Sequence, residues 1–129
     1  MPVIHAAFDV PNSVLHGIFV TAVEGGINHW ATVSAYRWSV VLDGTAQEDH
    51  EGFHARIVDR GPAMPTRHRV DRETILRGLT KALSTAPGVA DRIVRDARRE
   101  VGLRDGGYLD AEGADAIVQL GLFNELVYG

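Results

Sequence analysis

The sequence predicts an α+β fold, in which an antiparallel β-sheet has three to four helices packed on one side. Segments rich in β-branched and aromatic residues are concentrated in the first half of the chain, and segments with helical periodicity dominate the second half. Strands followed by helices are typical of α+β proteins. No shift in composition divides the chain, and its 129 residues fit a single domain spanning 1–129.

The chain should begin with a strand and a helix. Residues 3–10 (VIHAAFDV) are apolar and partly alternating, and Pro11 ends this predicted strand. Asn12 or Ser13 can then cap a helix. The buried stripe of that helix recurs at helical spacing and comprises Val14, Leu15, Ile18, Phe19, Ala22 and Val23. The glycine pair at 25–26 follows the stripe, where a left-handed C-terminal cap is expected.

A long strand is predicted over residues 27–42, because this segment is rich in aromatic and β-branched residues. Strand alternation would place six side chains on one face, namely Trp30, Thr32, Ser34, Tyr36, Trp38 and Val40. An acidic, hairpin-like loop over residues 43–52 leads to a second strand over residues 53–59. A proline-containing loop then leads to a short strand around residues 67–70.

Three helices are predicted in the second half. Asp71 can cap a helix over residues 71–85, in which apolar residues recur at helical spacing. A helix over residues 88–101 has one apolar side and one side rich in Arg and Asp, which is typical of a solvated face. Asp110 starts the last helix, over residues 110–123, and the closing LVYG is a candidate strand that would rejoin the sheet.

Composition excludes several classes of function. The formal net charge of −4 argues against binding a nucleic-acid polymer by general phosphate neutralisation. The chain has no cysteine, which rules out disulfides, thiolate nucleophiles and cysteine-based zinc sites. No apolar run approaches the roughly 18–20 residues of a membrane span, and the N-terminus lacks a basic n-region. We therefore expect a cytoplasmic protein that does not contact a membrane.

No catalytic or metal-binding signature occurs in the sequence in the structural context that it requires. The histidines are scattered, and HEGFH at residues 50–54 matches HExxH only across a predicted loop and strand and not on a helix, so no metal site is expected. There is no GxSxG, GxGxxG or Walker motif. We therefore predict no catalytic residue, no metal and no cofactor.

Planar and cationic side chains remain as a candidate site. If the strands that carry them pair, rings and guanidinium groups converge at one edge of the sheet. Aromatic rings can stack on a base, and arginine forks match phosphate oxygens. The candidate ligand-binding residues are Trp30 and Tyr36 for stacking, Arg56, Arg67 and Arg69 for phosphates, and Asn28 or His29 for a polar edge. In the alternative interpretation, the Trp30, Tyr36 and Trp38 rings form core or a subunit interface.

Two blocks of the sequence resemble a known family. A helix ending in EGG, followed by an amide, a second ring and Trp, occurs within residues 14–30, and an aspartate-capped helix reading DAIVQLGLFNELVYG occurs within residues 110–129. These blocks resemble the phage-encoded anti-Thoeris sponges, which sequester glycocyclic ADP-ribose signals. The sequence departs from the pattern at His29, where tyrosine is usual, and at Asn124, where glycine is usual.

The resemblance implies a non-enzymatic, homo-oligomeric protein of phage origin, acting in the cytoplasm of an infected bacterium. It would bind a cyclic ADP-ribose-type nucleotide at subunit boundaries without cleaving it. Two other functions stay open at this point. One is a small inhibitor that binds a host protein directly, and the other is a cyclic-nucleotide hydrolase that uses His54 or His68 with a nearby carboxylate.

Overall fold

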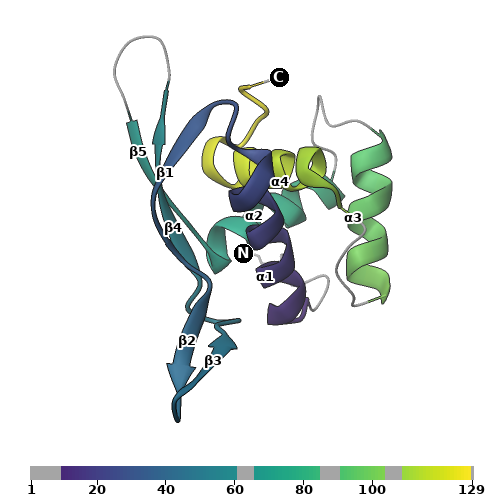
Figure 1. The fold of residues 1–129 in the computed structure, drawn as a ribbon. Coiled ribbons are helices and arrows are strands. Elements are labelled where there is room, and N and C mark those ends of the chain that lie inside the picture. The colour runs from purple at the N-terminus through teal and green to yellow at the C-terminus, as the bar shows by residue number, and fades with distance from the viewer. Residues whose placement is uncertain (1–9, 61–65, 85–90, 104–108, 129) are drawn as a thin grey trace, which may run out of the picture.

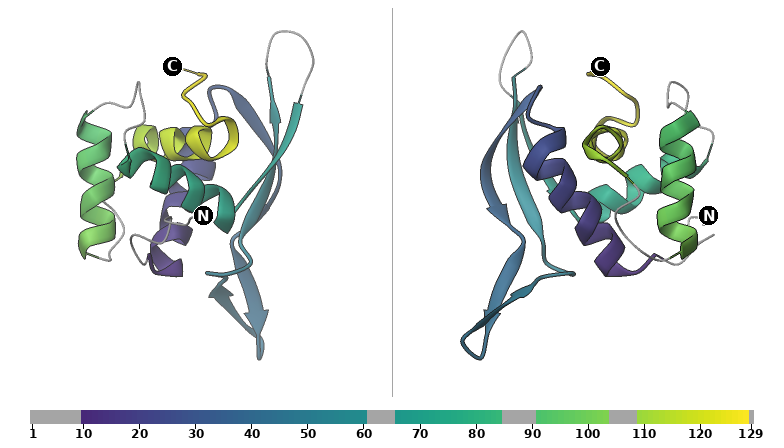
Figure 2. Two further views of the ribbon diagram at one scale, coloured as in Figure 1. Left: turned by 180° about the vertical axis from the view of Figure 1, so that it is seen from behind. Right: turned by 45° about the vertical axis from the view of Figure 1, so that its right-hand side comes forward.

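The computed structural model describes residues 10–60, 66–84, 91–103 and 109–128, and it confirms the α+β class. The helices all lie on one side of the main sheet (Figures 1 and 2). The elements are α1 (Asn12–Thr21), the π-helical turn η2 (Ala22–Gly26), β1 (Ala31–Arg37), β2 (Ser39–Leu42), β3 (Thr45–Glu48), β4 (His54–Asp59), β5 (Thr66–Asp71), α2 (Arg72–Leu83), α3 (Asp91–Leu103) and α4 (Ala111–Phe123). The strand predicted over residues 3–10 lies outside the described residues except for Val10, which is not part of a strand. None of the described helices combines the length and the apolar character needed to cross a membrane.

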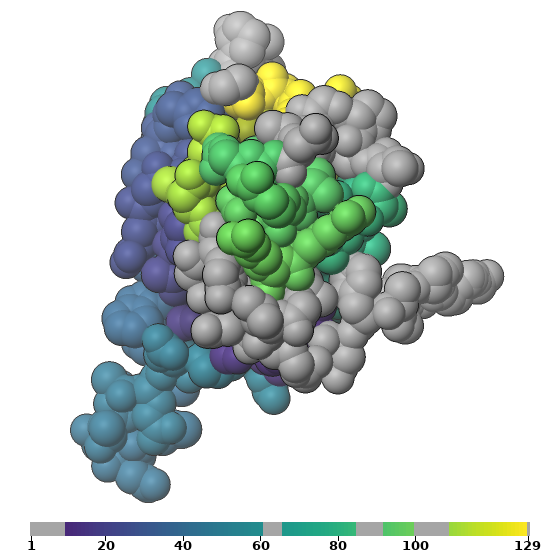
Figure 3. Space-filling view, turned by 90° about the vertical axis from the view of Figure 1, so that its right-hand side faces the viewer, coloured from purple at the N-terminus to yellow at the C-terminus, as the bar shows by residue number. Residues whose placement is uncertain are grey.

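The strands form two antiparallel sheets. The main sheet has the order β1-β4-β5, and β2 pairs with β3 in a separate hairpin. Asp43 (φ 51°) and Gly44 (φ 77°) form the turn of this hairpin, as expected for a tight turn between two strands. Figure 3 shows the hairpin, drawn in blue, projecting from the rest of the molecule.

The long strand predicted over residues 27–42 is wrong in its extent, because the chain leaves the main sheet at Trp38. The carbonyl oxygen of Trp38 accepts hydrogen bonds from the Asp49 amide (2.9 Å) and from His16 Nε2 (2.9 Å). These bonds redirect the chain into the hairpin. Trp38 is 43% exposed as a result.

The predicted six-residue face is also wrong, because β1 contains a β-bulge. The pairing of β1 with β4 shifts register between Val33 and Ala35, so that Ser34 is the extra residue. The shift turns both Val33 and Tyr36 toward the helices, and the Tyr36 ring lies 5.6 Å from the Phe19 ring.

Three predictions differ from the structure: the two ends of the first helix and the C-terminal segment. Pro11, with no side-chain hydrogen bond, occupies the cap position of α1 in place of Asn12 or Ser13. Gly25 and Gly26 belong to η2 and have no positive φ, so they do not form a left-handed cap. The C-terminal LVYG is not a strand over residues 126–128. Its backbone instead bonds to a side chain of α4.

The predicted caps of the later helices are confirmed. Asp71 accepts a hydrogen bond from the Thr74 amide (3.1 Å), and Thr74 Oγ1 accepts one from the Asp71 amide (3.2 Å), which completes a capping box. Asp110 accepts from the Gly113 amide (2.9 Å) at the start of α4. Both helices therefore begin where the sequence predicts.

Helix α4 is the centre of the core. Residues 113–121 are all buried, and two glycines let α4 cross α2 with the backbones in contact. A Cβ on Gly78 of α2 would overlap the carbonyl oxygen of Ile117, and a Cβ on Gly121 of α4 would overlap that of Thr74. The packing of α2 on α4 therefore requires glycine at both positions.

Replacing Gly78 with alanine tests this contact. We expect Gly78→Ala to lower the free energy of unfolding by about 3 kcal/mol, because backbone atoms must move apart to admit the methyl group. Gly17→Ala is the matched control, since among the described residues no atom outside the adjacent backbone of α1 lies within 4 Å of its Cβ position, and alanine favours a helix by about 0.5–1 kcal/mol. Urea denaturation of both variants measures the difference. Equal stabilities would contradict the assigned packing.

Candidate functional site

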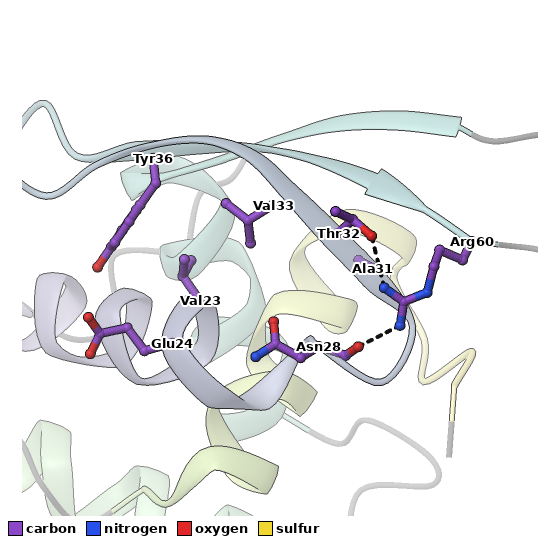
Figure 4. Close-up of a pocket in the computed structure, with 8 residues that line it drawn as sticks. All are labelled: Val23, Glu24, Asn28, Ala31, Thr32, Val33, Tyr36 and Arg60. Atoms are coloured by element: carbon purple, nitrogen blue, oxygen red, sulfur yellow. Dashed lines mark hydrogen bonds between the residues drawn. The ribbon is translucent and has the colours of Figure 1, made fainter.

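Two hollows flank β1, which is an edge strand of the main sheet. The first, which we call the edge groove, lies between η2 and β1 and has a volume of about 500 Å³. It is lined by Val23, Glu24, Asn28, Ala31, Thr32, Val33, Tyr36 and Arg60 (Figure 4). The second, the outer-face hollow, has a volume of about 480 Å³ and is lined by Ser34, Arg56, Ile57, Val58, Arg67, His68 and Arg69. Both volumes lie in the range of about 300–1,000 Å³ that is typical of ligand pockets.

The edge groove has opposite charges at its two ends. Glu24 and the hydroxyl of Tyr36 face each other at one end, and Arg60 lies at the other (Figure 4). Arg60 donates to Thr32 Oγ1 (2.9 Å) and to the backbone oxygen of Asn28 (2.5 Å). Arg60 therefore connects β1 to the loop that precedes it. At the other end of the groove, the Tyr36 hydroxyl oxygen is buried and has no hydrogen-bond partner among the described residues.

Arginines gather on the face of the main sheet that points away from the helices. Arg56 of β4 and Arg69 of β5 are directly paired residues, and Arg67 pairs with Val58 on the same face. Like charges opposite each other on paired strands are destabilising. Arg69 forms an ion pair with Asp71, with 3.2 Å between Nε and Oδ2. Neither Arg56 nor Arg67 forms an ion pair within the described part of the chain. The outer-face hollow therefore carries positive charge that the described residues do not neutralise.

The two hollows differ in the charges of the residues that line them. A phosphate in the edge groove would share it with the Glu24 carboxylate, whereas no carboxylate lines the outer-face hollow. The fork-like donors of arginine match phosphate oxygens in pairs. The outer-face hollow is thus the better site for an anion, although the chain as a whole has a net charge of −4.

The structure divides the seven candidate ligand-binding residues among several places. Arg56, Arg67 and Arg69 do converge, in the outer-face hollow. Asn28 and Tyr36 line the edge groove. The expectation that Trp30 and Tyr36 meet these three arginines in one site is therefore wrong. The β-bulge turns Tyr36 to the helix side of the sheet, away from the arginines, and Trp30 is buried in the core.

Trp30 cannot stack on a ligand in this structure. Its side chain is 3% exposed, and its ring is stacked on Tyr128 with a centroid distance of 4.9 Å and an interplanar angle of 5°. Its indole Nε1 donates to Asp115 Oδ1 (2.7 Å). For Trp30, the alternative that assigned the rings to the core is confirmed.

His29 belongs to the same corner of the molecule as Trp30. Its Nδ1 lies 3.1 Å from the Gly26 carbonyl oxygen, and its Nε2 lies 3.7 Å from Asp115 Oδ2. Burial raises the pKa of Asp115, while its bonds with Trp30 and Gln119 act in the opposite direction. His29 is thus turned toward the α4 carboxylate and lines neither hollow.

Sequence reasoning did not place Arg60 and Glu24 in the site. Glu24 belongs to the EGG segment, where its role as a groove residue depends on the π-helical turn, and no local pattern indicates that turn. Arg60 directly follows β4, and its backbone amide donates to the Trp30 carbonyl oxygen (2.9 Å). The signal for Arg60 was its position directly after the predicted strand over residues 53–59, in the same basic region of the sequence as Arg56 and Arg67.

Of the two histidines considered for hydrolysis, His68 lines the outer-face hollow and His54 lines neither hollow. His68 Nε2 lies 3.8 Å from Asp59 Oδ2, but the ring packs edge-on against Phe123 of α4 on the inner side of the sheet. His54 Nδ1 lies 3.0 Å from the Gly52 carbonyl oxygen. Neither hollow therefore combines a histidine with a carboxylate among its lining residues.

Comparison with protein-family models, with curated proteins and with solved structures finds no significant match to this chain. The functional argument therefore rests on the geometry described above.

Titration of Tyr36 tests the geometry of the edge groove. Burial, and after it the Glu24 carboxylate, raises the pKa of Tyr36 to about 12. Because the folded pKa lies above the ordinary value near 10, the neutral phenol stabilises the fold fully below about pH 10. That contribution is lost as the pH rises from about 10 through about 12. The absorbance of tyrosinate measures the transition, and the difference between wild type and Tyr36→Phe isolates the contribution of Tyr36 from that of Tyr128, whose bond to Asp59 also raises its pKa.

Glu24→Gln should lower the pKa of Tyr36, because the neighbouring negative charge is removed. Glu73→Gln is the matched control, since Glu73 lies on α2 and pairs with Arg72. Circular dichroism must show that each variant is folded during the titration. Titration of the wild-type Tyr36 near pH 10 in the folded state would contradict the geometry.

Proposed function

We propose that this protein binds a phosphate-bearing nucleotide of the cyclic ADP-ribose type and holds it without cleaving it, as the resemblance to the anti-Thoeris sponges implies. The arginines of the outer-face hollow would contact the phosphates. The observation that carries this proposal is the direct cross-strand pairing of Arg56 with Arg69, with Arg67 beside them. An anion between these guanidinium groups would relieve their mutual repulsion.

Charge contacts dominate the proposed site. The outer-face hollow contains no Trp, Tyr or Phe among its lining residues, so the stacking first assigned to Trp30 and Tyr36 is not part of this site. Affinity should therefore depend on the phosphates more than on the base. It should also fall as salt is added, because exposed charges are screened within about 8–10 Å at physiological ionic strength.

Self-association forms the second part of the proposal. The outer-face hollow is bounded by the sheet on one side, and a second copy of the chain would supply another wall. The projecting hairpin exposes three large apolar side chains, Trp38 (43%), Val41 (68%) and Leu42 (49%). Such residues are suited to the apolar part of a subunit interface. The proposed protein is thus a homo-oligomer that encloses its ligand between copies.

Calorimetric titration with a cyclic ADP-ribose-type nucleotide tests the proposal. We expect Arg56→Gln and Arg67→Gln each to weaken binding by about 10–100-fold, which corresponds to one lost charge-assisted bond of about 1.5–3 kcal/mol. Arg95→Gln removes the same charge from the far side of the molecule on α3, and Glu24→Gln alters the edge groove. Both controls should keep wild-type affinity. Heat release by the wild type, followed by recovery of intact nucleotide after denaturation, is the expected result.

Absence of binding by the folded wild type, or recovery of a cleaved nucleotide, would refute the proposal. Wild-type affinity in both arginine variants would refute the assignment to the outer-face hollow.

Direct binding of a host protein is the second candidate function, and the exposed hairpin favours it. Light scattering after size exclusion distinguishes the two roles of the hairpin. Under the first proposal the wild type is oligomeric, and Val41→Ser with Leu42→Ser makes it monomeric. A wild type that is monomeric and binds no nucleotide would favour a host-protein partner at Trp38, Val41 and Leu42.

A further inference from the structure

Three side chains with metal-ligating atoms meet where the hairpin joins the body of the molecule. His16 comes from α1, Glu48 from the end of β3, and His50 from the turn that follows β3. One ligand atom from each of the three lies within 4.8 Å of the other two. His50 Nε2 lies 2.9 Å from Glu48 Oε1, and the His16 and His50 rings are 4.8 Å apart.

His16 is held in place by a hydrogen bond of the kind that metal-binding histidines make. It is 3% exposed, although it lies on the otherwise apolar buried side of α1. Its Nε2 lies 2.9 Å from the Trp38 carbonyl oxygen. A carbonyl oxygen only accepts hydrogen bonds, so Nε2 is the donor, and in the neutral ring Nδ1 is the nitrogen that can bind a metal. A hydrogen bond from one ring nitrogen to a backbone carbonyl commonly fixes the ring whose other nitrogen binds a metal.

We propose that His16, Glu48 and His50 bind one Zn²⁺ ion. Two imidazoles and a carboxylate form a recognised zinc ligand set, in which water fills the fourth position. Ligand atoms around tetrahedral zinc are about 3.3–3.5 Å apart, so the cluster would contract by roughly 1.5 Å at most. Glu48 is exposed and His50 half-buried, so their side chains are free to make this movement while His16 stays in place.

The ion would fix the hairpin to α1. Within the described residues, the base of the hairpin is otherwise held by the bonds to the Trp38 carbonyl and by the pairing of Arg37 with Asp49 (3.2 Å). A bridge from α1 to residues 48 and 50 would set the direction in which β2 and β3 project. The proposal does not depend on the nucleotide site, because none of the three ligands lines the outer-face hollow.

Metal titration tests this proposal. The tag-free protein is first treated with a chelator to remove bound metal and is then titrated with Zn²⁺. We expect the wild type to bind one Zn²⁺ per chain with a dissociation constant of about 1 μM or below. Its melting temperature should rise in the presence of Zn²⁺. Co²⁺ in the same site should show the intense visible absorption of a tetrahedral ion.

His50→Ala and Glu48→Gln should each weaken Zn²⁺ binding at least about tenfold and remove the thermal shift. His54→Ala is the matched control, because it removes an imidazole from the neighbouring strand outside the cluster. The test uses His50 and Glu48 and not His16, because replacement of buried His16 would also affect folding. Absence of stoichiometric Zn²⁺ binding would overturn the proposal, as would wild-type affinity in both His50→Ala and Glu48→Gln.

Discussion

Helix α4 is held against two other elements at glycines that leave no room for a side chain. Gly78 and Gly121 bring α2 and α4 into backbone contact. A Cβ on Gly26, at the end of η2, would lie 2.5 Å from the Ala111 carbonyl oxygen and 3.1 Å from Asp115 Cβ. These contacts fix α4 on both sides, and the close approach of η2 to α4 explains why the glycine pair belongs to a helical turn that packs on α4. By fixing α4, these glycine contacts also set where its buried polar side chains, including Asp115 and Gln119, lie.

Two of those polar groups connect the C-terminus to the sheet. Asp115 accepts from Trp30 and from Gln119 Nε2 (3.0 Å), and Gln119 Oε1 accepts from the amides of Val127 and Tyr128 (2.8 Å each). Tyr128 covers the Trp30 ring and donates to Asp59 Oδ1 (2.5 Å). A buried carboxylate is costly unless it is hydrogen-bonded, and these donors offset that cost. Trp30 therefore stabilises the fold, and the proposed ligand would be held elsewhere.

Features of the structure could be predicted from the sequence when the interacting residues lie close together along the chain. The caps at Asp71 and Asp110 were correct because a cap involves residues three positions apart. The three outer-face arginines were correctly grouped because they lie on neighbouring strands of one meander. The role of Trp30 could not be predicted, since its partner Asp115 is 85 positions away. The end of β1 likewise depends on His16, which is 22 positions from Trp38.

The same one-sided packing that builds the core leaves the outer face of the main sheet open (Figure 2). Acidic side chains set the net charge of −4, but Asp49 and Asp71 are each already paired with an arginine near this face. The local electrostatic potential there is set by Arg56 and Arg67, which form no ion pair with any described residue, and screening limits the reach of distant carboxylates. An anion on an open sheet remains partly hydrated and gains little from each contact. A second copy covering that face would exclude water and strengthen the same charge contacts, because the effective dielectric constant would fall. In the proposed assembly, subunit association and ligand affinity would therefore reinforce each other.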